Sequence, residues 1–125
     1  IKNNNRSKRV LFLNNLSIEE IAIIYQSAEI MIYPSIFEGF GIPILEALFA
    51  KVPVITSKGS CFAETGGPHS KYVNPLSFSE LKETILEIQK SPELQNNMKE
   101  KGFIYAQQFT DKNIANNLMN IYSNL

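Results

Sequence analysis

Short apolar runs alternate with segments of helical pattern along this chain, and that alternation restricts the fold more than any other feature. The runs are residues 10–13, 30–33, 54–56 and 72–73. Short, continuously apolar strands are typical of a parallel sheet that is buried on both faces, with helices as the crossover connections. We therefore predict an α/β fold with a Rossmann-like parallel sheet flanked by helices, in a single domain over residues 1–125.

Local capping signals place the helices between these strands. Ser17 and Ser77 are each followed three residues later by a glutamate, Glu20 and Glu80, which is the capping-box pattern. A further helix is expected after Ser91-Pro92, and Thr110 is expected to cap the last one. The last helix carries an apolar stripe that needs a partner surface. The stripe consists of Ile114, Leu118, Ile121, Tyr122 and Leu125.

Composition excludes several classes of protein. Lysine and arginine together number 12, as do aspartate and glutamate, so the formal net charge is zero and no strong field attracts nucleic acid. The single cysteine, Cys61, forms no internal disulfide and provides no metal cluster, which fits a reducing compartment. The chain begins at Ile1 rather than methionine, and we expect it to be a piece of a longer protein.

The segment from residue 33 to residue 47 carries the candidate chemistry. Pro34 ends the strand before it, and Gly39 and Gly41 permit a tight turn and a close approach of a ligand to the main chain. Pro43 suits the first turn of a helix. The amide groups near Gly41 and Ile42 would then face outward at the positive end of a helix dipole, which favours a phosphate. In parallel sheets the ligand crevice lies at the carboxyl ends of the strands, where this turn is predicted to be.

Two carboxylates flank the glycine turn. Glu38 precedes it and Glu46 follows it, so both are expected to reach one crevice. Ionised carboxylates only accept hydrogen bonds, which suits the adjacent hydroxyls of a ribose or a hexose. In the alternative interpretation, Glu46 complements the helix N-terminus and Glu38 is a solvated loop residue. The lone His69 is interpreted as an exposed loop histidine rather than a catalytic base.

Taken in order, these residues resemble the C-terminal domain of the group 1 glycosyltransferases, which are family 4 enzymes of the GT-B fold. The resemblance covers nearly the whole chain, and the two glutamates separated by seven residues are its most specific part. It is carried by Phe12-Leu13, Leu16-Ser17, Glu19-Glu20-Ile21, Tyr25, Tyr33-Pro34-Ser35, Glu38-Gly39-Phe40-Gly41-Ile42-Pro43, Glu46-Ala47, Pro53-Val54-Ile55-Thr56-Ser57, Glu64 and Val73-Asn74-Pro75.

The resemblance implies a retaining transferase that moves a sugar from a nucleoside-diphosphate sugar to an acceptor without a metal or separate cofactor. Glu38 matches the glutamate that contacts the donor hexose near its reacting carbon, and Glu46 matches the one that holds the ribose hydroxyls. Main-chain amides over Gly39, Phe40, Gly41 and Ile42 would cradle donor sugar and diphosphate. The loop at Asn15 and Leu16 matches the segment that touches the nucleobase.

The resemblance also implies parts that these 125 residues do not supply. The basic residues that neutralise the diphosphate belong to an earlier strand and helix, and the acceptor site belongs to a preceding N-terminal domain. We therefore expect the isolated chain to be inactive and to bind nucleotide weakly. We also expect either a rearranged sheet, with residues 10–13 pairing beside residues 30–33, or self-association of the chain.

Two other classes of protein compete with this interpretation. A non-catalytic nucleotide-sugar binding or regulatory module is the alternative, although the chain retains both glutamates. A receiver-type interaction protein is disfavoured because Asp111 is the only aspartate. The resemblance further implies a carbohydrate or lipid-linked acceptor in polysaccharide biosynthesis. It also implies a cytoplasmic location, either free or peripheral at the inner face of the membrane.

Overall fold

Three parallel strands form the sheet at the centre of the protein. A computed structural model describes residues 10–125, and its strands are β1 (Met31–Tyr33), β2 (Val54–Ser57) and β3 (Lys71–Val73), side by side in chain order. Met31 lies opposite Val54 in the first pair, and Ile55 lies opposite Lys71 in the second. The predicted α/β class with a parallel sheet flanked by helices is confirmed.

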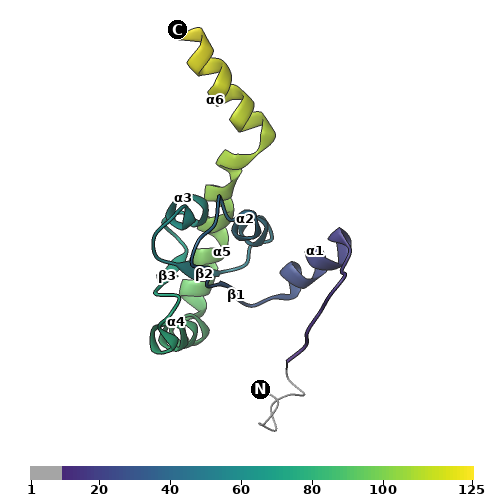
Figure 1. Ribbon diagram of the computed structural model, residues 1–125, viewed down its shortest axis with the longest axis vertical. Helices are drawn as coiled ribbons and strands as arrows, with labels where there is room; N and C mark the ends of the chain where they lie inside the picture. Colours follow the sequence, from purple (N-terminus) through teal and green to yellow (C-terminus); the bar gives the residue numbers. More distant parts are fainter. Residues whose placement is uncertain (1–9) are drawn as a thin grey trace.

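Helices connect the strands and continue beyond the last one (Figure 1). They are α1 (Ile18–Ser27), α2 (Ile42–Phe49), α3 (Phe62–Gly66), α4 (Phe78–Lys90), α5 (Pro92–Ala106), the 3-10 turn η2 (Gln107–Phe109) and α6 (Asp111–Ser123). Of these, α2 and α3 are the crossovers that parallel strands require, because each strand must start again from the same end of the sheet; α1 precedes the sheet, and the others follow it.

Alternate residues of β2 face two separate apolar clusters. Val54 packs in a cluster with residues of α2 and α3, and Ile55 packs in another with α4. Helix α5 contributes to both, through Ala106 in the first cluster and Met98 in the second. β2 is therefore buried along its whole length. The core thus fixes the points at which the loops leave the carboxyl ends of the strands.

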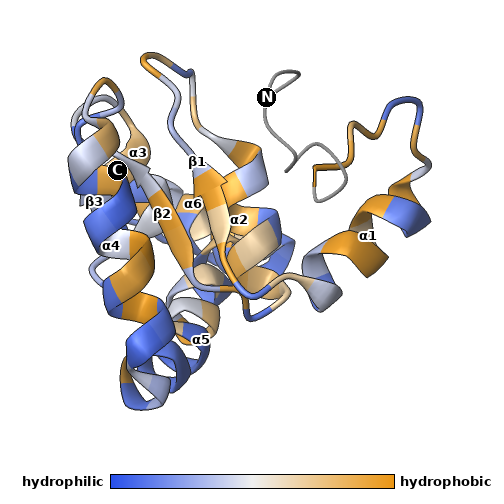
Figure 2. Cartoon of the chain, turned by 90° about the horizontal axis from the view of Figure 1, so that it is seen from below, coloured by the Kyte–Doolittle hydropathy of each residue, from blue (hydrophilic) through white to orange (hydrophobic). Residues whose placement is uncertain are grey.

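Helices α1 and α6 extend away from this core (Figure 1). The capping box of α1 forms as predicted, with Ser17 and Glu20 each bound to the other's backbone amide. Apolar residues on α1 face solvent, which Figure 2 shows as orange on its ribbon. All members of the apolar stripe on α6 are exposed, so its need for a partner surface stays a prediction.

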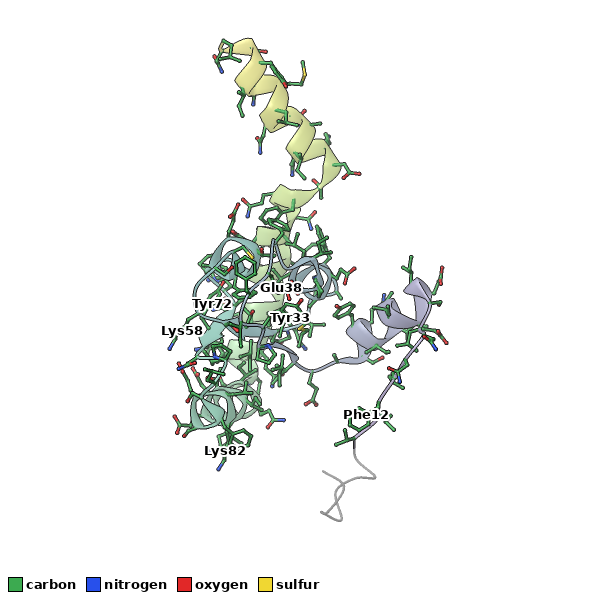
Figure 3. All side chains as sticks on the ribbon, viewed as in Figure 1. Phe12, Tyr33, Glu38, Lys58, Tyr72 and Lys82 are labelled. Atoms are coloured by element: carbon green, nitrogen blue, oxygen red, sulfur yellow. The ribbon has the colours of Figure 1, made fainter. Side chains whose placement is uncertain are left out.

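The predicted strand at residues 10–13 is wrong. These residues form no strand, and Leu11 and Phe12 are 79% and 78% exposed. Phe12 lies on the segment before α1, well away from the strand ends (Figure 3). A run of four apolar residues becomes a strand only when an edge pairs with it and a face of it is buried. The expected pairing beside β1 is likewise absent from the sheet of the described residues, and self-association stays a prediction.

Two predicted caps differ in detail. Ser77 accepts from the amide of Glu80, but the Glu80 carboxylate binds Lys58 and the Asn74 amide instead of closing the box. The Thr110 hydroxyl donates to the Gln107 carbonyl rather than capping α6. Within residues 10–125, no helix has both the length and the apolar character needed to cross a membrane.

Candidate functional site

The loops after β1 and β2 meet at the carboxyl end of the sheet. Residues 34–41 follow β1 and lead into α2, whose N-cap is Gly41. Gly41 has a φ of +85°, a left-handed conformation that other residues adopt only with strain. Ile44 donates to the Gly41 carbonyl and Pro43 has no amide hydrogen, so the amides of Gly41 and Ile42 start the helix. This confirms the predicted turn and helix start.

Glu38 is fixed by side chains from its own loop and from β1. The Tyr33 hydroxyl donates to Glu38 Oε1 at 2.7 Å, and the Ser35 hydroxyl donates to the same oxygen at 2.9 Å. The backbone carbonyl of Glu38 accepts from Ser60 and Cys61, each at 3.4 Å, which ties it to the loop after β2. Figure 3 shows Tyr33 and Glu38 side by side near the strand ends. Glu38 is therefore held and only half-buried, unlike a freely solvated loop residue.

The contact with Glu38 alters the chemistry of Tyr33. The hydrogen bond to the Glu38 carboxylate raises the pKa of the Tyr33 phenol, with burial and the negative charge of Glu38 adding to the effect. Tyr33 is anchored from the sheet as well, because the Thr56 hydroxyl donates to its carbonyl at 3.0 Å. At neutral pH the phenol is a hydrogen-bond donor to an acceptor-only group.

The glycine turn itself is supported from beneath. The buried hydroxyl of Thr65 on α3 donates to the Phe40 carbonyl. The Phe40 ring meets Phe109 edge to face, with ring centroids 5.6 Å apart. A Cβ on Gly41 would lie 3.1 Å from Cδ1 of Ile44. The main chain of this turn is thus fixed by α3, η2 and the first turn of α2.

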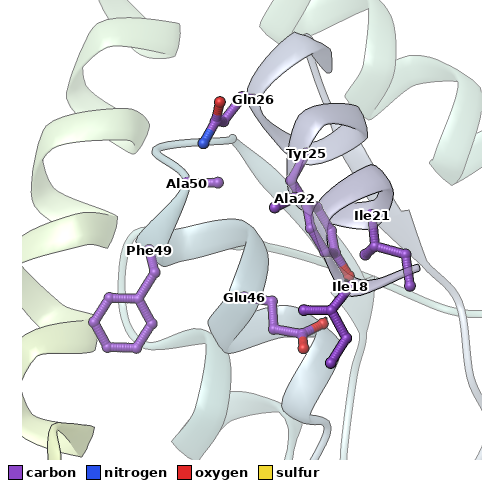
Figure 4. Close-up of a pocket in the computed structure, with 8 residues that line it drawn as sticks. All are labelled: Ile18, Ile21, Ala22, Tyr25, Gln26, Glu46, Phe49 and Ala50. Carbon is purple, nitrogen blue, oxygen red and sulfur yellow. Dashed lines mark hydrogen bonds between the residues drawn. The ribbon is translucent and has the colours of Figure 1, made fainter. Parts of the chain in front are cut away.

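Glu46 lies in the second turn of α2 beside a cavity between α1 and α2 (Figure 4). The cavity has a volume of about 380 Å³. The Tyr25 hydroxyl donates to Glu46 Oε2 at 3.1 Å across it. The residues that line it are Ile18, Ile21, Ala22, Tyr25, Gln26, Glu46, Phe49 and Ala50. The cavity is mainly apolar with one carboxylate, the composition of a small-molecule site.

Burial raises the pKa of Tyr25 to about 12, and the nearby charge and hydrogen bond of Glu46 act in the same direction. Its ring packs against the buried cluster that contains Ala47 and Leu48 of α2. Tyr25 is therefore a protonated donor with an apolar body, fixed between the two helices.

The structure brings some predicted site residues together and leaves others apart. Glu38, Gly39, Phe40, Gly41 and Ile42 form one continuous loop at the start of α2, and Glu46 follows on that helix. Glu38 does not line the cavity beside Glu46, so the two carboxylates do not share that cavity.

The predicted nucleobase residues lie in the turn before α1. Asn15 is exposed with a φ of +56°, and Leu16 is half-buried. Among residues 10–125 neither lines the cavity, although Ile18 does. Their role in binding a base stays a prediction.

Sequence reasoning gives no role to Tyr25, Tyr33 and Ser35, although all three bind the glutamates. Tyr33 and Ser35 reach Glu38 within a short local segment, whereas Tyr25 reaches Glu46 only because α1 lies beside α2. His69 precedes β3, at the opposite end of the sheet from the glycine turn, and it is half-buried rather than exposed as expected. Within the described residues, no three His, Cys, Asp or Glu side chains gather as ligands for a metal ion.

Comparison with known proteins identifies the family. Residues 1–104 match the family described as glycosyl transferases group 1, and the chain belongs to that family. It is 39% identical over 85 residues to O-antigen chain mannosyltransferase RfbU of Salmonella typhimurium, which covers 68% of this chain and 24% of that protein. It is 27% identical over 122 residues to O-antigen chain mannosyltransferase B of Escherichia coli, which covers 98% of this chain and 32% of that protein.

A solved structure supports the same family assignment. Sucrose-phosphate synthase from Thermosynechococcus elongatus superposes with a TM-score of 0.83 at 27% identity, over 96% of this chain and 31% of that one. The predicted resemblance to the C-terminal domain of group 1 glycosyltransferases, and with it the GT-B type of fold, is confirmed. The chain spans 24% and 32% of the length of the two mannosyltransferases.

Proposed function

We propose that this chain supplies the donor-binding half-site of a retaining glycosyltransferase that uses a nucleoside-diphosphate sugar. We further propose mannose as the transferred sugar, because both relatives described above are named as mannosyltransferases. The acceptor would then be a growing polysaccharide or a lipid-linked saccharide, in keeping with the O-antigen named for those relatives.

One observation carries this proposal. Two carboxylates are held by hydroxyl groups: Glu38, which precedes the N-terminus of α2 in the chain, and Glu46, which follows it in the second turn. A helix N-terminus favours the negative charge of a diphosphate, and carboxylates favour sugar hydroxyls. A nucleotide sugar presents these groups in the same order, with a sugar on each side of the diphosphate.

Each residue then has a role. Glu46 accepts hydrogen bonds from the ribose hydroxyls, with the cavity between α1 and α2 beside it. Glu38 accepts from a hydroxyl of the donor hexose. The amides of the loop over Gly39, Phe40, Gly41 and Ile42 bind the diphosphate. The turn at Asn15 and Leu16 contacts the base.

The chemistry follows from charge. As the bond between the anomeric carbon and the diphosphate oxygen breaks, negative charge grows on the diphosphate and positive charge on the sugar. The helix N-terminus stabilises the first and the Glu38 carboxylate stabilises the second. We propose that the acceptor hydroxyl attacks directly on the face from which the diphosphate departs and passes its proton to a diphosphate oxygen, so that Glu38 stabilises charge and forms no bond to the sugar. No metal or separate cofactor is part of this proposal.

The acceptor site and the basic groups that neutralise the diphosphate are proposed to come from segments outside these 125 residues. This agrees with the greater length of the relatives, of which the chain spans about a quarter to a third. We therefore expect the isolated chain to bind donor weakly and to transfer no sugar.

Amide NMR of the 125-residue chain tests the proposal at millimolar ligand. Uridine, guanosine and adenosine diphosphates are titrated alone and with mannose attached. We expect shifts over residues 39–46 that disappear in Glu46→Ala, and additional mannose-dependent shifts that disappear in Glu38→Gln. Glu93→Gln at the start of α5 is the matched control and should bind as the wild type does.

Shifts confined to other surfaces, or none in a folded sample, would contradict the donor half-site. Binding of nucleotide sugar by the chain, combined with no transfer by any longer protein that contains it, would favour the non-catalytic binding module instead.

A further inference from the structure

Both candidate sugar-binding carboxylates are held by a tyrosine hydroxyl. Tyr33 donates to Glu38 Oε1 at 2.7 Å, and Tyr25 donates to Glu46 Oε2 at 3.1 Å. An ionised carboxylate has no hydrogen to give, so each phenol must be the donor. The same arrangement thus occurs twice, once from helix α1 and once from strand β1, which follow one another in the chain.

The two tyrosine rings rest on the same rigid surface. Both pack against the buried cluster that includes Ala47 and Leu48 of α2 and Val54 of β2. The carbonyl of Tyr33 is also bound by the Thr56 hydroxyl. A ring packed on a core moves little, so its hydroxyl offers a fixed point at the edge of the site. Glu46 itself is exposed and has no such support of its own.

Each carboxylate keeps one oxygen for a ligand. Glu38 Oε1 accepts from Tyr33 and from Ser35, whereas no residue between 10 and 125 hydrogen-bonds to Oε2. Glu46 Oε2 accepts from Tyr25, and Oε1 has no partner within the same residues. When one oxygen of a carboxylate is fixed by a hydrogen bond, the orientation of the other oxygen is fixed as well. The side chain then loses less conformational entropy when a ligand hydroxyl binds.

We propose that Tyr33 and Tyr25 are positioning residues that orient Glu38 and Glu46 so that Glu38 Oε2 and Glu46 Oε1 accept hydroxyls of a nucleotide sugar. This inference rests on the proposed function. It requires the ligand to present an O–H group, and not an anionic oxygen, to each of the two free carboxylate oxygens. Tyr33 acts on the hexose through Glu38, and Tyr25 acts on the ribose through Glu46.

The contacts can be tested without any ligand, by following tyrosine ionisation with site-resolved ¹³C NMR of the ring carbons. The hydrogen bond to Glu38 raises the pKa of Tyr33, so Glu38→Gln should lower that pKa and leave Tyr25 nearly unchanged. Burial and Glu46 raise the pKa of Tyr25 to about 12, so Glu46→Gln should lower it in part. A Tyr33 that titrates identically in the wild type and in Glu38→Gln would overturn its half of the proposal.

The positioning role is tested by comparing affinities for a nucleoside diphosphate and its mannose conjugate. Tyr33→Phe should lower the affinity for the conjugate by about three- to tenfold and leave that for the diphosphate unchanged. Tyr25→Phe should lower both by a similar factor, because the ribose is common to both ligands. Phenylalanine keeps the ring contacts with the core, and thermal unfolding checks that each variant is folded.

Tyr122→Phe is the control, because Tyr122 is 69% exposed on α6. It should change neither affinity. If the wild type binds and the Tyr25 and Tyr33 variants bind equally well, the positioning role is overturned while the donor half-site stands. If the folded wild type binds none of the ligands, the proposed function itself is overturned and the positioning role with it.

Discussion

The hydroxyl of Thr65 on α3 donates to the carbonyl of Phe40 in the glycine turn, 25 positions earlier in the chain. Thr65 is fully buried, so this bond joins the candidate site directly to the core. The turn is therefore part of the folded framework, and substitutions beneath it should affect both stability and binding.

Replacing Thr65 with valine keeps the shape of the side chain and removes this donor. Removing the donor from this partly buried carbonyl costs about 1–3 kcal/mol, so we expect the free energy of unfolding to fall by about that amount. Urea denaturation measures it, and donor binding should weaken in parallel. The control is Thr84→Val on α4, whose hydroxyl binds only the Glu80 carbonyl of its own helix. Equal effects of the two substitutions on binding would refute the link to the site.

Gly41 and Gly39 provide a matched pair of substitutions in one loop. Alanine at Gly41 would have to adopt a φ of +85° and approach Ile44 to 3.1 Å, so we expect a loss of about 1–2 kcal/mol. A Cβ at Gly39 meets nothing within 4 Å, and Gly39→Ala should leave the urea midpoint almost unchanged. A Gly39→Ala variant as unstable as Gly41→Ala would contradict the described geometry of the turn.

Stability should fall at alkaline pH through Tyr72. Burial, with the nearby Tyr105 as a second cause, raises its pKa to about 12. The unfolded chain releases this proton near the ordinary tyrosine pKa of about 10. The stabilising contribution is therefore complete below pH 10 and is lost as the pH rises toward 12.

Urea midpoints measured between pH 9 and pH 11, a range of roughly two units around that ordinary pKa, should fall with pH for the wild type. They should fall less steeply for Tyr72→Phe. The comparison is with Tyr122→Phe, which changes an exposed ring and should leave the slope as it is in the wild type. A Tyr72→Phe slope equal to the wild-type slope would show that Tyr72 makes no such contribution.

Much of the secondary structure could be predicted because its signals are local. Ser17 and Glu20 close their box within one turn, and Pro92 starts α5 where expected. Residues 10–13 have an equally apolar pattern, yet they form no strand, because a strand depends on a neighbouring edge that no local pattern encodes.

The candidate site also has features that local sequence predicts and features that depend on tertiary contacts. Glu38, Glu46 and Gly41 were identifiable because the turn and its carboxylates lie within one short segment. The contact of Tyr25 with Glu46 was not, since it joins residues 21 positions apart and forms only where α1 lies beside α2. Tyr33 is only five positions from Glu38, but the path of the loop brings its hydroxyl to the carboxylate. Side-chain hydrogen bonds between elements follow from tertiary geometry, which periodicity does not specify.

Ser57 at the end of β2 offers a substitution that should stabilise the protein. Its hydroxyl oxygen is fully buried and has no hydrogen-bond partner among the described residues. Ser57→Ala removes this desolvated group, and we expect the free energy of unfolding to rise by about 1 kcal/mol. Ser70→Ala is the contrasting case, because that buried hydroxyl donates to the Gly66 carbonyl at 2.6 Å and its loss should destabilise. A destabilised Ser57→Ala variant would mean that the hydroxyl has a partner after all.

The central claim is that Glu38 and Glu46 bind the two sugars of one nucleoside-diphosphate sugar across the N-terminus of α2. A crystal structure of the chain soaked with a nucleoside-diphosphate mannose tests it most directly. The account predicts the ribose hydroxyls at Glu46 Oε1, a mannose hydroxyl at Glu38 Oε2 and the diphosphate over the amides of Gly41 and Ile42. A ligand bound with its diphosphate away from this turn, or with both sugars out of reach of the two glutamates, would contradict it.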